Sequence, residues 1–129
     1  MDLKSYFEKT KGFGVISTAD KDGRVDSAVF SRPHVMDDGA IAFIMNDNLT
    51  HHNLQSNPRA AYLFKETADS YKGKRFFLTK ISEEKDSKLL TQLKRRSYTA
   101  DKDLKKSRFL VFFKIEKELP LIGPGEEED

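Results

Sequence analysis

Cysteine and tryptophan are both absent from this chain of 129 residues. Without cysteine the protein has no disulfide, no thiolate metal ligand, no iron–sulfur cluster and no cysteine nucleophile. Small secreted domains often depend on disulfides, so this absence favours a reducing compartment. No apolar run approaches the roughly 20 residues of a membrane-spanning helix, and the first residues lack the apolar core of a secretion signal. We therefore expect a cytoplasmic protein that does not enter a membrane.

An excess of charge of either sign is absent as well. The 23 lysines and arginines nearly balance the 21 aspartates and glutamates, and the formal net charge is +2. Nucleic-acid-binding domains normally concentrate basic residues on one face, so we expect no nucleic-acid partner. What the chain does have is ten phenylalanines and four tyrosines in a composition that is 37% hydrophobic. This composition is typical of a globular protein with an aromatic, β-rich core.

Short apolar runs alternate with turn residues along the chain, which is typical of β-hairpins. The runs predict six strands, at residues 13–19, 25–32, 40–46, 59–65, 74–82 and 108–116. Helical spacing of apolar residues predicts three helices, at residues 2–11, 50–57 and 83–96. Asp2 is placed to cap the first helix, and Asp-Gly pairs at Gly23 and Gly39 favour tight turns. The remaining segments are a polar connection at 97–107 and a carboxy-terminal tail at 118–129.

The order of these elements predicts the fold class. Successive hairpins without long helical crossovers favour an antiparallel sheet, and six such strands would curl into a barrel. We therefore expect a mainly β protein with flanking helices, folded as a single domain over residues 1–129. Phe30, Phe43 and Phe64 are expected to lie in its core.

The densest group of polar side chains lies at the start of the predicted helix 50–57. A helix amino terminus has unpaired N–H donors and a partial positive charge, so it attracts phosphate. Thr50 adds a hydroxyl, and His51 and His52 add ring N–H donors. The alternative is that Thr50 only caps the helix and both histidines are solvent-exposed polar residues. Adjacent histidines point about 100° apart on a helix, so we expect no metal site here.

A second candidate stretch is SAVFSRPHV at residues 27–35. If this stretch lies beside strand 40–46, its backbone amides can face the edge of a flat heteroaromatic ligand. Arg32 could then bind phosphate through its planar guanidinium. The alternative for Arg32 is a surface ion pair with Asp37 or Asp38.

These motifs resemble the pyridoxamine 5′-phosphate oxidase-like, FMN-binding split-barrel family. The resemblance runs from about Phe13 to Phe64 and includes SAVFSRP, AFIMN and an Asn-Leu-x-x-Asn-Pro segment that starts at Asn53 and leads into RAAYLF. The strands at 74–82 and 108–116 match the remaining barrel strands. The resemblance implies a six-stranded split barrel that binds flavin mononucleotide (FMN) between the two subunits of a homodimer.

The resemblance also implies which residues hold the cofactor. The residues that would flank the isoalloxazine edge and part of the phosphate tail are Val29, Phe30, Ser31 and Arg32. Those that would line the same pocket from the next strand and the short helix are Ile44, Met45, Thr50, His51, His52 and Asn53. The family commonly has Ser-Arg-Lys around the phosphate, where this chain has threonine and histidines. That change removes fixed positive charge, so FMN affinity would be lower and more dependent on pH.

The function expected from this resemblance is an FMN-dependent oxidoreductase acting on a small substrate, with NADH or NADPH as a possible donor. Alternatives are a non-catalytic flavin-binding sensor or carrier, a deazaflavin or haem protein, and an interaction module without a cofactor. His34, His51 and His52 are the possible axial ligands of a haem. The carboxy-terminal Trp and Arg of true pyridoxamine phosphate oxidases are missing, so that reaction is not expected. The sequence identifies neither the substrate nor any catalytic residue.

Overall fold

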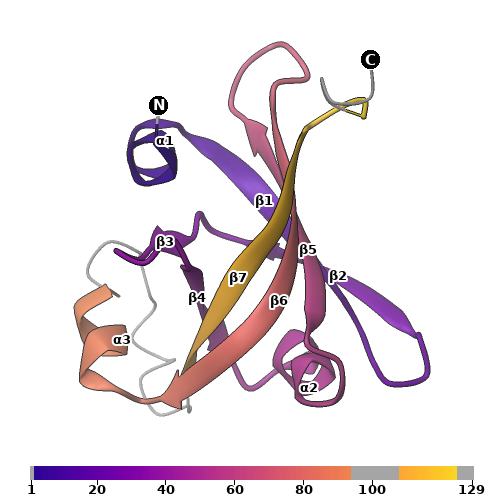
Figure 1. The fold of residues 1–129 in the computed structure, drawn as a ribbon, viewed down its shortest axis with the longest axis vertical. Helices are drawn as coiled ribbons and strands as arrows, with labels where there is room; N and C mark the ends of the chain where they lie inside the picture. The colour runs from indigo at the N-terminus through magenta and orange to yellow at the C-terminus, as the bar shows by residue number, and fades with distance from the viewer. Residues whose placement is uncertain (1, 94–107, 125–129) are drawn as a thin grey trace.

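The computed structural model describes residues 2–93 and 108–124, which form one curled antiparallel sheet with three helices around it (Figure 1). The strands are hydrogen-bonded in the order β2-β1-β5-β6-β7-β4-β3. In chain order the elements are α1 (Leu3–Lys9), β1 (Gly12–Ala19), β2 (Val25–Phe30), β3 (His34–Val35), β4 (Ile41–Asn46), α2 (Leu49–Ser56), β5 (Arg59–Glu66), β6 (Gly73–Lys85), α3 (Lys88–Leu93) and β7 (Arg108–Pro120).

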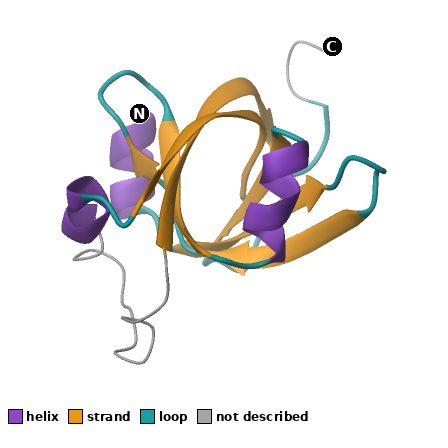
Figure 2. Ribbon diagram, turned by 90° about the horizontal axis from the view of Figure 1, so that it is seen from below, coloured by secondary structure: helices purple, strands orange, loops and turns teal. Residues whose placement is uncertain are grey.

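The sheet closes almost into a ring when seen along its axis (Figure 2), and the ring is split between β2 and β3. Six strands were predicted, and the seventh is the two-residue strand β3. It was missed because two residues carry no alternation of apolar and polar side chains. The expected pairing of residues 27–35 with strand 40–46 holds only for β3, which pairs with Ile41 and Ala42. Strand β2 pairs instead with β1, at the other edge of the sheet.

Strands β6 and β7 are both 13 residues long and pair along most of their length. Two register shifts, after Phe77 and after Lys80, interrupt the ladder. Such bulges bend a strand and increase its twist, which allows this pair to wrap around the core. The predicted helix 83–96 was wrong at its start, because Glu83–Lys85 pair with β7 and α3 begins at Lys88. The predicted tail was also wrong at its start, because residues 118–120 belong to β7. Residues 94–107 lie outside the described residues.

Helices α1 and α2 and both Asp-Gly turns begin where the sequence predicted them, within one or two residues. The Asp2 side chain accepts a hydrogen bond of 2.8 Å from the amide of Ser5 at the start of α1. Gly23 and Gly39 have φ angles of 84° and 90°, as tight turns with an Asp-Gly pair require. The helices are six to eight residues long, and among residues 2–93 and 108–124 no helix has the length and apolar character needed to traverse a lipid bilayer.

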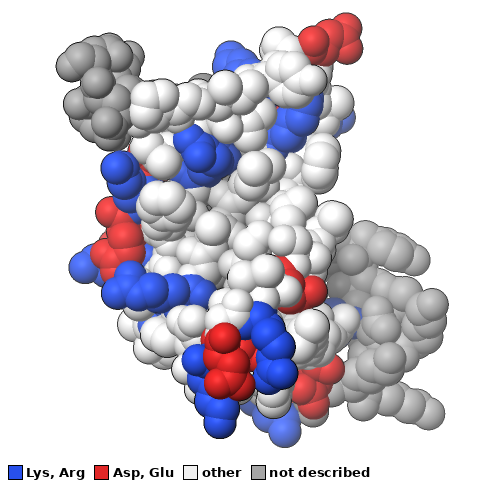
Figure 3. All heavy atoms as spheres, turned by 90° about the vertical axis from the view of Figure 1, so that its right-hand side faces the viewer, with Lys and Arg blue, Asp and Glu red and all other residues white. Residues whose placement is uncertain are grey.

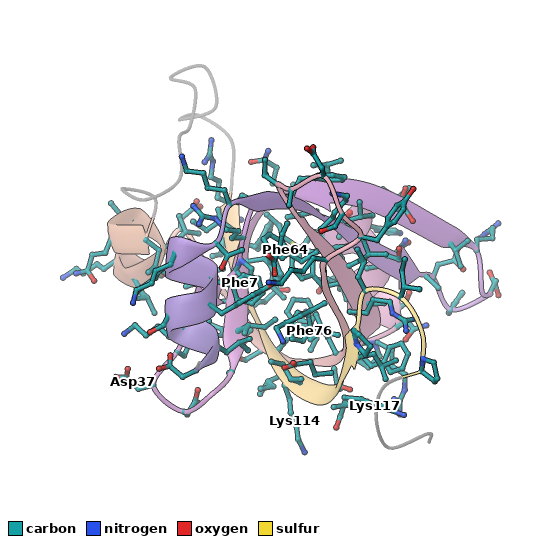
Figure 4. All side chains as sticks on the ribbon, turned by 90° about the horizontal axis from the view of Figure 1, so that it is seen from above. Phe7, Asp37, Phe64, Phe76, Lys114 and Lys117 are labelled. Atoms are coloured by element: carbon teal, nitrogen blue, oxygen red, sulfur yellow. The ribbon has the colours of Figure 1, made fainter. Side chains whose placement is uncertain are left out.

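The core is a cluster of aromatic and aliphatic side chains inside the curled sheet. Phe7 of α1 reaches into it and meets Phe64 and Phe76, which point inward from β5 and β6 (Figure 4). The Phe7 and Phe64 rings lie edge to face, with centroids 5.2 Å apart, an arrangement that aromatic pairs prefer. The predicted core residues Phe43 and Phe64 are buried, and Phe30 packs against them. Helix α1 therefore closes one end of the barrel.

We predict that Gly14→Ala destabilises the protein by about 1–3 kcal/mol, the usual cost of forcing extra volume into a packed core. A Cβ atom at Gly14 would overlap the Tyr62 ring and hydroxyl, which lie against this glycine from β5. Urea unfolding would measure the change. Tyr62→Phe is the comparison, because it removes only the hydroxyl that donates to the Ser31 carbonyl at 3.2 Å. A Gly14→Ala variant as stable as the wild type would contradict this packing.

Candidate functional site

Helix α2 packs against β1, β2 and β4 and begins directly after β4. Asn48 is its N-cap, and the Asn48 side chain accepts a hydrogen bond of 3.1 Å from the amide of His51. The alternative in which Thr50 caps the helix is therefore wrong. The helix ends at Ser56, before Asn57-Pro58, because proline disfavours helical geometry in the residue before it. The amides of Leu49 and Thr50 precede the first intrahelical hydrogen bond, so they are oriented toward an acceptor outside the helix.

Two of the predicted site residues face inward from α2. Thr50 is only 2% exposed, and its hydroxyl lies 3.5 Å from a carboxylate oxygen of Asp26 on β2. Asn53 is buried, and its side-chain amide donates a hydrogen bond of 3.1 Å to the Thr18 hydroxyl on β1. Both side chains attach the helix to the barrel.

His51 is also buried, and it joins α2 to strands β6 and β7. Its ring stacks on Phe109 with centroids 3.7 Å apart and an interplanar angle of 14°. Its Nε2 lies 3.0 and 3.1 Å from the two carboxylate oxygens of Glu83. The Gln55 amide and the Lys80 ammonium donate to the same carboxylate at 3.0 and 2.6 Å. His51 is therefore the centre of a polar network under the helix, and His52 is the histidine of this pair that is exposed.

The charge of Glu83 is set by this network. Partial burial acts to raise the pKa of Glu83, but the hydrogen bonds from Lys80, His51 and Gln55 outweigh it and lower the pKa to about 2. The carboxyl group is therefore ionised at neutral pH. An ionised, hydrogen-bonded group at this position stabilises the attachment of α2.

The stretch that follows β2 places its predicted site residues in different directions. Val29 is 74% exposed on the outer face of the sheet, whereas the Phe30 ring packs edge to face with Phe43, 6.0 Å away. The exposed Ser31 accepts a hydrogen bond from Tyr62 through its carbonyl. Arg32 donates to two carbonyls at the end of α1, those of Phe7 and Thr10, at 2.8 and 3.1 Å.

Arg32 and Thr50 therefore do not converge on one phosphate within this chain. Thr50 contacts Asp26, and the four steps along β2 from Asp26 to Phe30 alone extend about 13 Å away from this contact. The remaining two predicted residues lie on β4. Met45 is part of the main core, and Ile44 packs with the smaller cluster of Ala42, Leu90 and Leu110 beside α3.

The outer face of β1, β2, β5 and β6 carries a group of exposed apolar side chains. Val15 of β1 pairs with Val29 on one side and Leu63 on the other, so these three share one row. Phe13 lies two residues from Val15 and therefore points to the same face. Phe77 joins this face through Ala61, its partner on β5. The exposed fractions are 52% for Phe13, 39% for Leu63 and 46% for Phe77. We call Phe13, Val15, Val29, Leu63 and Phe77 the outer apolar face.

Charged side chains are unevenly distributed on the side of the molecule that faces right in Figure 1. Figure 3 shows a broad band of uncharged surface between groups of lysine, arginine and acidic side chains. Contiguous exposed apolar area on a small domain marks a site of association or ligand binding.

A separate cavity of about 410 Å³ lies between α1, β3 and α3. The buried ring of His34 is part of its wall, with Lys4, Glu8 and Asp37 among the charged residues. Within the part of the chain that the structure describes, no group of three or more histidine, aspartate or glutamate side chains is arranged to hold a metal ion.

Several residues around α2 were not identified from the sequence. Asp26, Lys80, Glu83 and Phe109 come from β2, β6 and β7, far along the chain from the helix. No local pattern marks them, because their role depends on strand register. Phe109 and Glu83 contact His51 only because Lys85 pairs with Phe109 and Glu83 with Val111.

Comparison with solved structures confirms the split-barrel fold. An FMN-binding protein from Syntrophomonas wolfei subsp. wolfei has a TM-score of 0.72 and 24% identity, covering 94% of this chain and 84% of its own. An F420 reductase has a TM-score of 0.70 and 15% identity, covering 92% and 98%. HutZ, the haem storage protein from Vibrio cholerae, has a TM-score of 0.66 and 17% identity, covering 92% and 91%.

Similar structures also include a candidate pyridoxamine 5′-phosphate oxidase from Listeria innocua, with a TM-score of 0.63 and 12% identity over 91% of this chain and 93% of its own. The fold of this chain is thus the one that the sequence resemblance implied. No family model and no curated protein sequence matches the chain.

We predict that Glu83 makes the protein less stable as the pH falls from about 4.5 to 2. A carboxyl group whose pKa is lowered by folding contributes stability that is fully present above its ordinary pKa and is lost as it becomes protonated in the folded state. Urea unfolding of the wild type and Glu83→Gln at several pH values would measure it. The difference in unfolding free energy should shrink through this window, and a constant difference would contradict the ionised network.

Proposed function

We propose that this protein is a flavin-binding redox protein that holds FMN at the interface of a homodimer. The observation that carries the proposal is the outer apolar face on a split barrel, with the first turn of α2 nearby. Asp26, which contacts α2, and Val29, on the outer apolar face, are three residues apart on β2, about 10 Å along the strand, and their side chains point to opposite faces of it. Similarity to the FMN-binding protein of Syntrophomonas wolfei supports the choice of cofactor.

The residues present fit the two ends of a flavin. Its ring is flat and largely apolar, and Val29, Val15 and Leu63 present an apolar strip that a ring and a second subunit would cover together. Its tail is polar, and the amides of Leu49 and Thr50 with the exposed ring of His52 are donors at the start of α2. Ser31, after β2, adds an exposed hydroxyl.

The chemistry would come from the cofactor, since a bound flavin accepts a hydride or donates electrons at its ring. The residues of this chain would bind the ring, orient it and exclude water from one face. The attachment of α2 through Thr50, Asn53 and His51 would keep the tail donors in place. In this scheme the cofactor supplies the redox chemistry and the chain supplies the binding site. An oxidoreductase acting on a small substrate would fit this scheme, and so would a flavin carrier or sensor that catalyses no reaction.

Haem is the second candidate ligand, and one observation favours it. His34 is 5% exposed and forms part of the wall of the 410 Å³ cavity, so it is the residue that would hold a haem iron there. The similarity to the haem storage protein HutZ supports the same alternative. His51 would have to lose the contacts of its Nε2 with Glu83 and Gln55 before it could bind iron.

We predict that the purified protein is yellow, or becomes yellow with added FMN, with an absorbance band at about 450 nm. Added NADH or NADPH would bleach this band if the protein accepts hydride. A Soret band would instead select haem. A colourless protein that binds neither FMN nor haem would contradict both proposed ligands. The remaining hypothesis would then be an interaction module without a cofactor.

We predict that Leu63→Asp yields a monomer that binds flavin at least tenfold more weakly. A carboxylate in the middle of the outer apolar face would be desolvated on dimerisation. Light scattering after size exclusion would measure the mass, and flavin fluorescence would measure the affinity. Ile81→Asp is the matched control, because Ile81 is 58% exposed and lies six residues along β6 from Arg75, the strand partner of Leu63, or about 20 Å. A Leu63→Asp protein that remains a flavin-binding dimer would contradict the proposed interface.

A further inference from the structure

More carboxylates than cations surround the first turn of α2. Asp26 lies on β2, Asp47 precedes the helix, and Glu83 lies on β6, and each contacts a side chain of the first turn. Two cations lie near them in the part of the chain that the structure describes: Lys80, which is 2.6 Å from Glu83, and the buried Arg108, which pairs with Asn46 before the helix. The side chain of Asp47 is 77% exposed, so its charge faces the solvent from which a ligand would arrive.

Two polar side chains of this turn, those of Thr50 and His51, already have partners, and the third, the His52 ring, is exposed. The Thr50 hydroxyl lies against Asp26, and Nε2 of His51 lies against Glu83. The Arg32 guanidinium donates to two carbonyls at the end of α1. An anion that approached the helix would meet backbone amides and the His52 ring, with the carboxylates of Asp26, Asp47 and Glu83 near the same turn.

The helix amino terminus attracts a phosphate about as strongly as the nearby carboxylates repel it. A helix amino terminus behaves as roughly half a positive charge, and its effect falls off within the first turn. Each carboxylate carries a full negative charge at a comparable distance, and solvent and salt screen both. A phosphate would therefore gain little net free energy here. The apolar contact with the ring would supply most of the affinity.

We infer that this chain recognises the ring of a flavin and not its phosphate, so that riboflavin and FMN bind with similar affinity. Asp26 and Asp47 are the residues that set this specificity. The inference rests on the proposed function, because it concerns the same site.

The test is to titrate the ligand-free full-length protein with riboflavin and with FMN at low ionic strength, following flavin fluorescence. The two Kd values should agree within about threefold. Asp47→Asn and Asp26→Asn should each tighten FMN binding about threefold to tenfold, because each removes one repelling charge. Neither should change riboflavin binding. Asp47→Asn alters an exposed side chain, so this variant keeps the test valid if Asp26→Asn fails to fold.

Asp69→Asn is the matched control, since it makes the same change in charge in the loop between β5 and β6. Figure 1 shows this loop at the end of the barrel opposite α2. Asp69→Asn should leave both Kd values unchanged. FMN binding more than tenfold tighter than riboflavin in the wild type, or an equal effect of Asp69→Asn and Asp47→Asn, would overturn the inference alone. If neither flavin binds, the proposed function is overturned together with it.

Discussion

The pairing of β6 with β7 is the interaction on which the rest of the structure depends. These two strands are the longest in the described part of the chain, and their ladder joins the half of the sheet that ends at β2 to the half that ends at β3. Its two register shifts bend the strands enough to enclose the aromatic core. The same ladder places Phe109 and Glu83 beneath α2, so the curvature of the sheet and the position of the helix have one cause.

The polar residues at the start of α2 are adjacent in the sequence, but some are buried against the barrel and others are exposed. Thr50, His51 and Asn53 are polar and adjacent, as residues of a ligand site often are, but they are buried and bonded to three different strands. Buried polar groups need such partners, because an unsatisfied one costs about 1–3 kcal/mol. The exposed residues of the first turn, Leu49 and His52, remain for contact with a ligand.

In the proposed site, the outer apolar face would contact the ring of the flavin, and the carboxylates near the first turn of α2 would lie close to its phosphate. An apolar strip shared by three strands favours a flat ring and a second copy of the chain, since covering such a strip removes it from water. The carboxylates near the helix offset the attraction that its amino terminus exerts on an anion. The proposed specificity for the ring, with little preference for the phosphate, would follow from the separation of these two features on the barrel.

The sequence by itself determined most of the local structure. The Asp-Gly turns, the Asp2 cap and the apolar runs predicted α1 and six of the strands, because each depends on residues a few positions apart. Only the tertiary structure decided that β2 lies at the edge away from β4, that β6 extends through Glu83, and that His51 contacts Glu83 instead of solvent. These features depend on strand register and on contacts between residues of different elements, which no local pattern of side chains encodes.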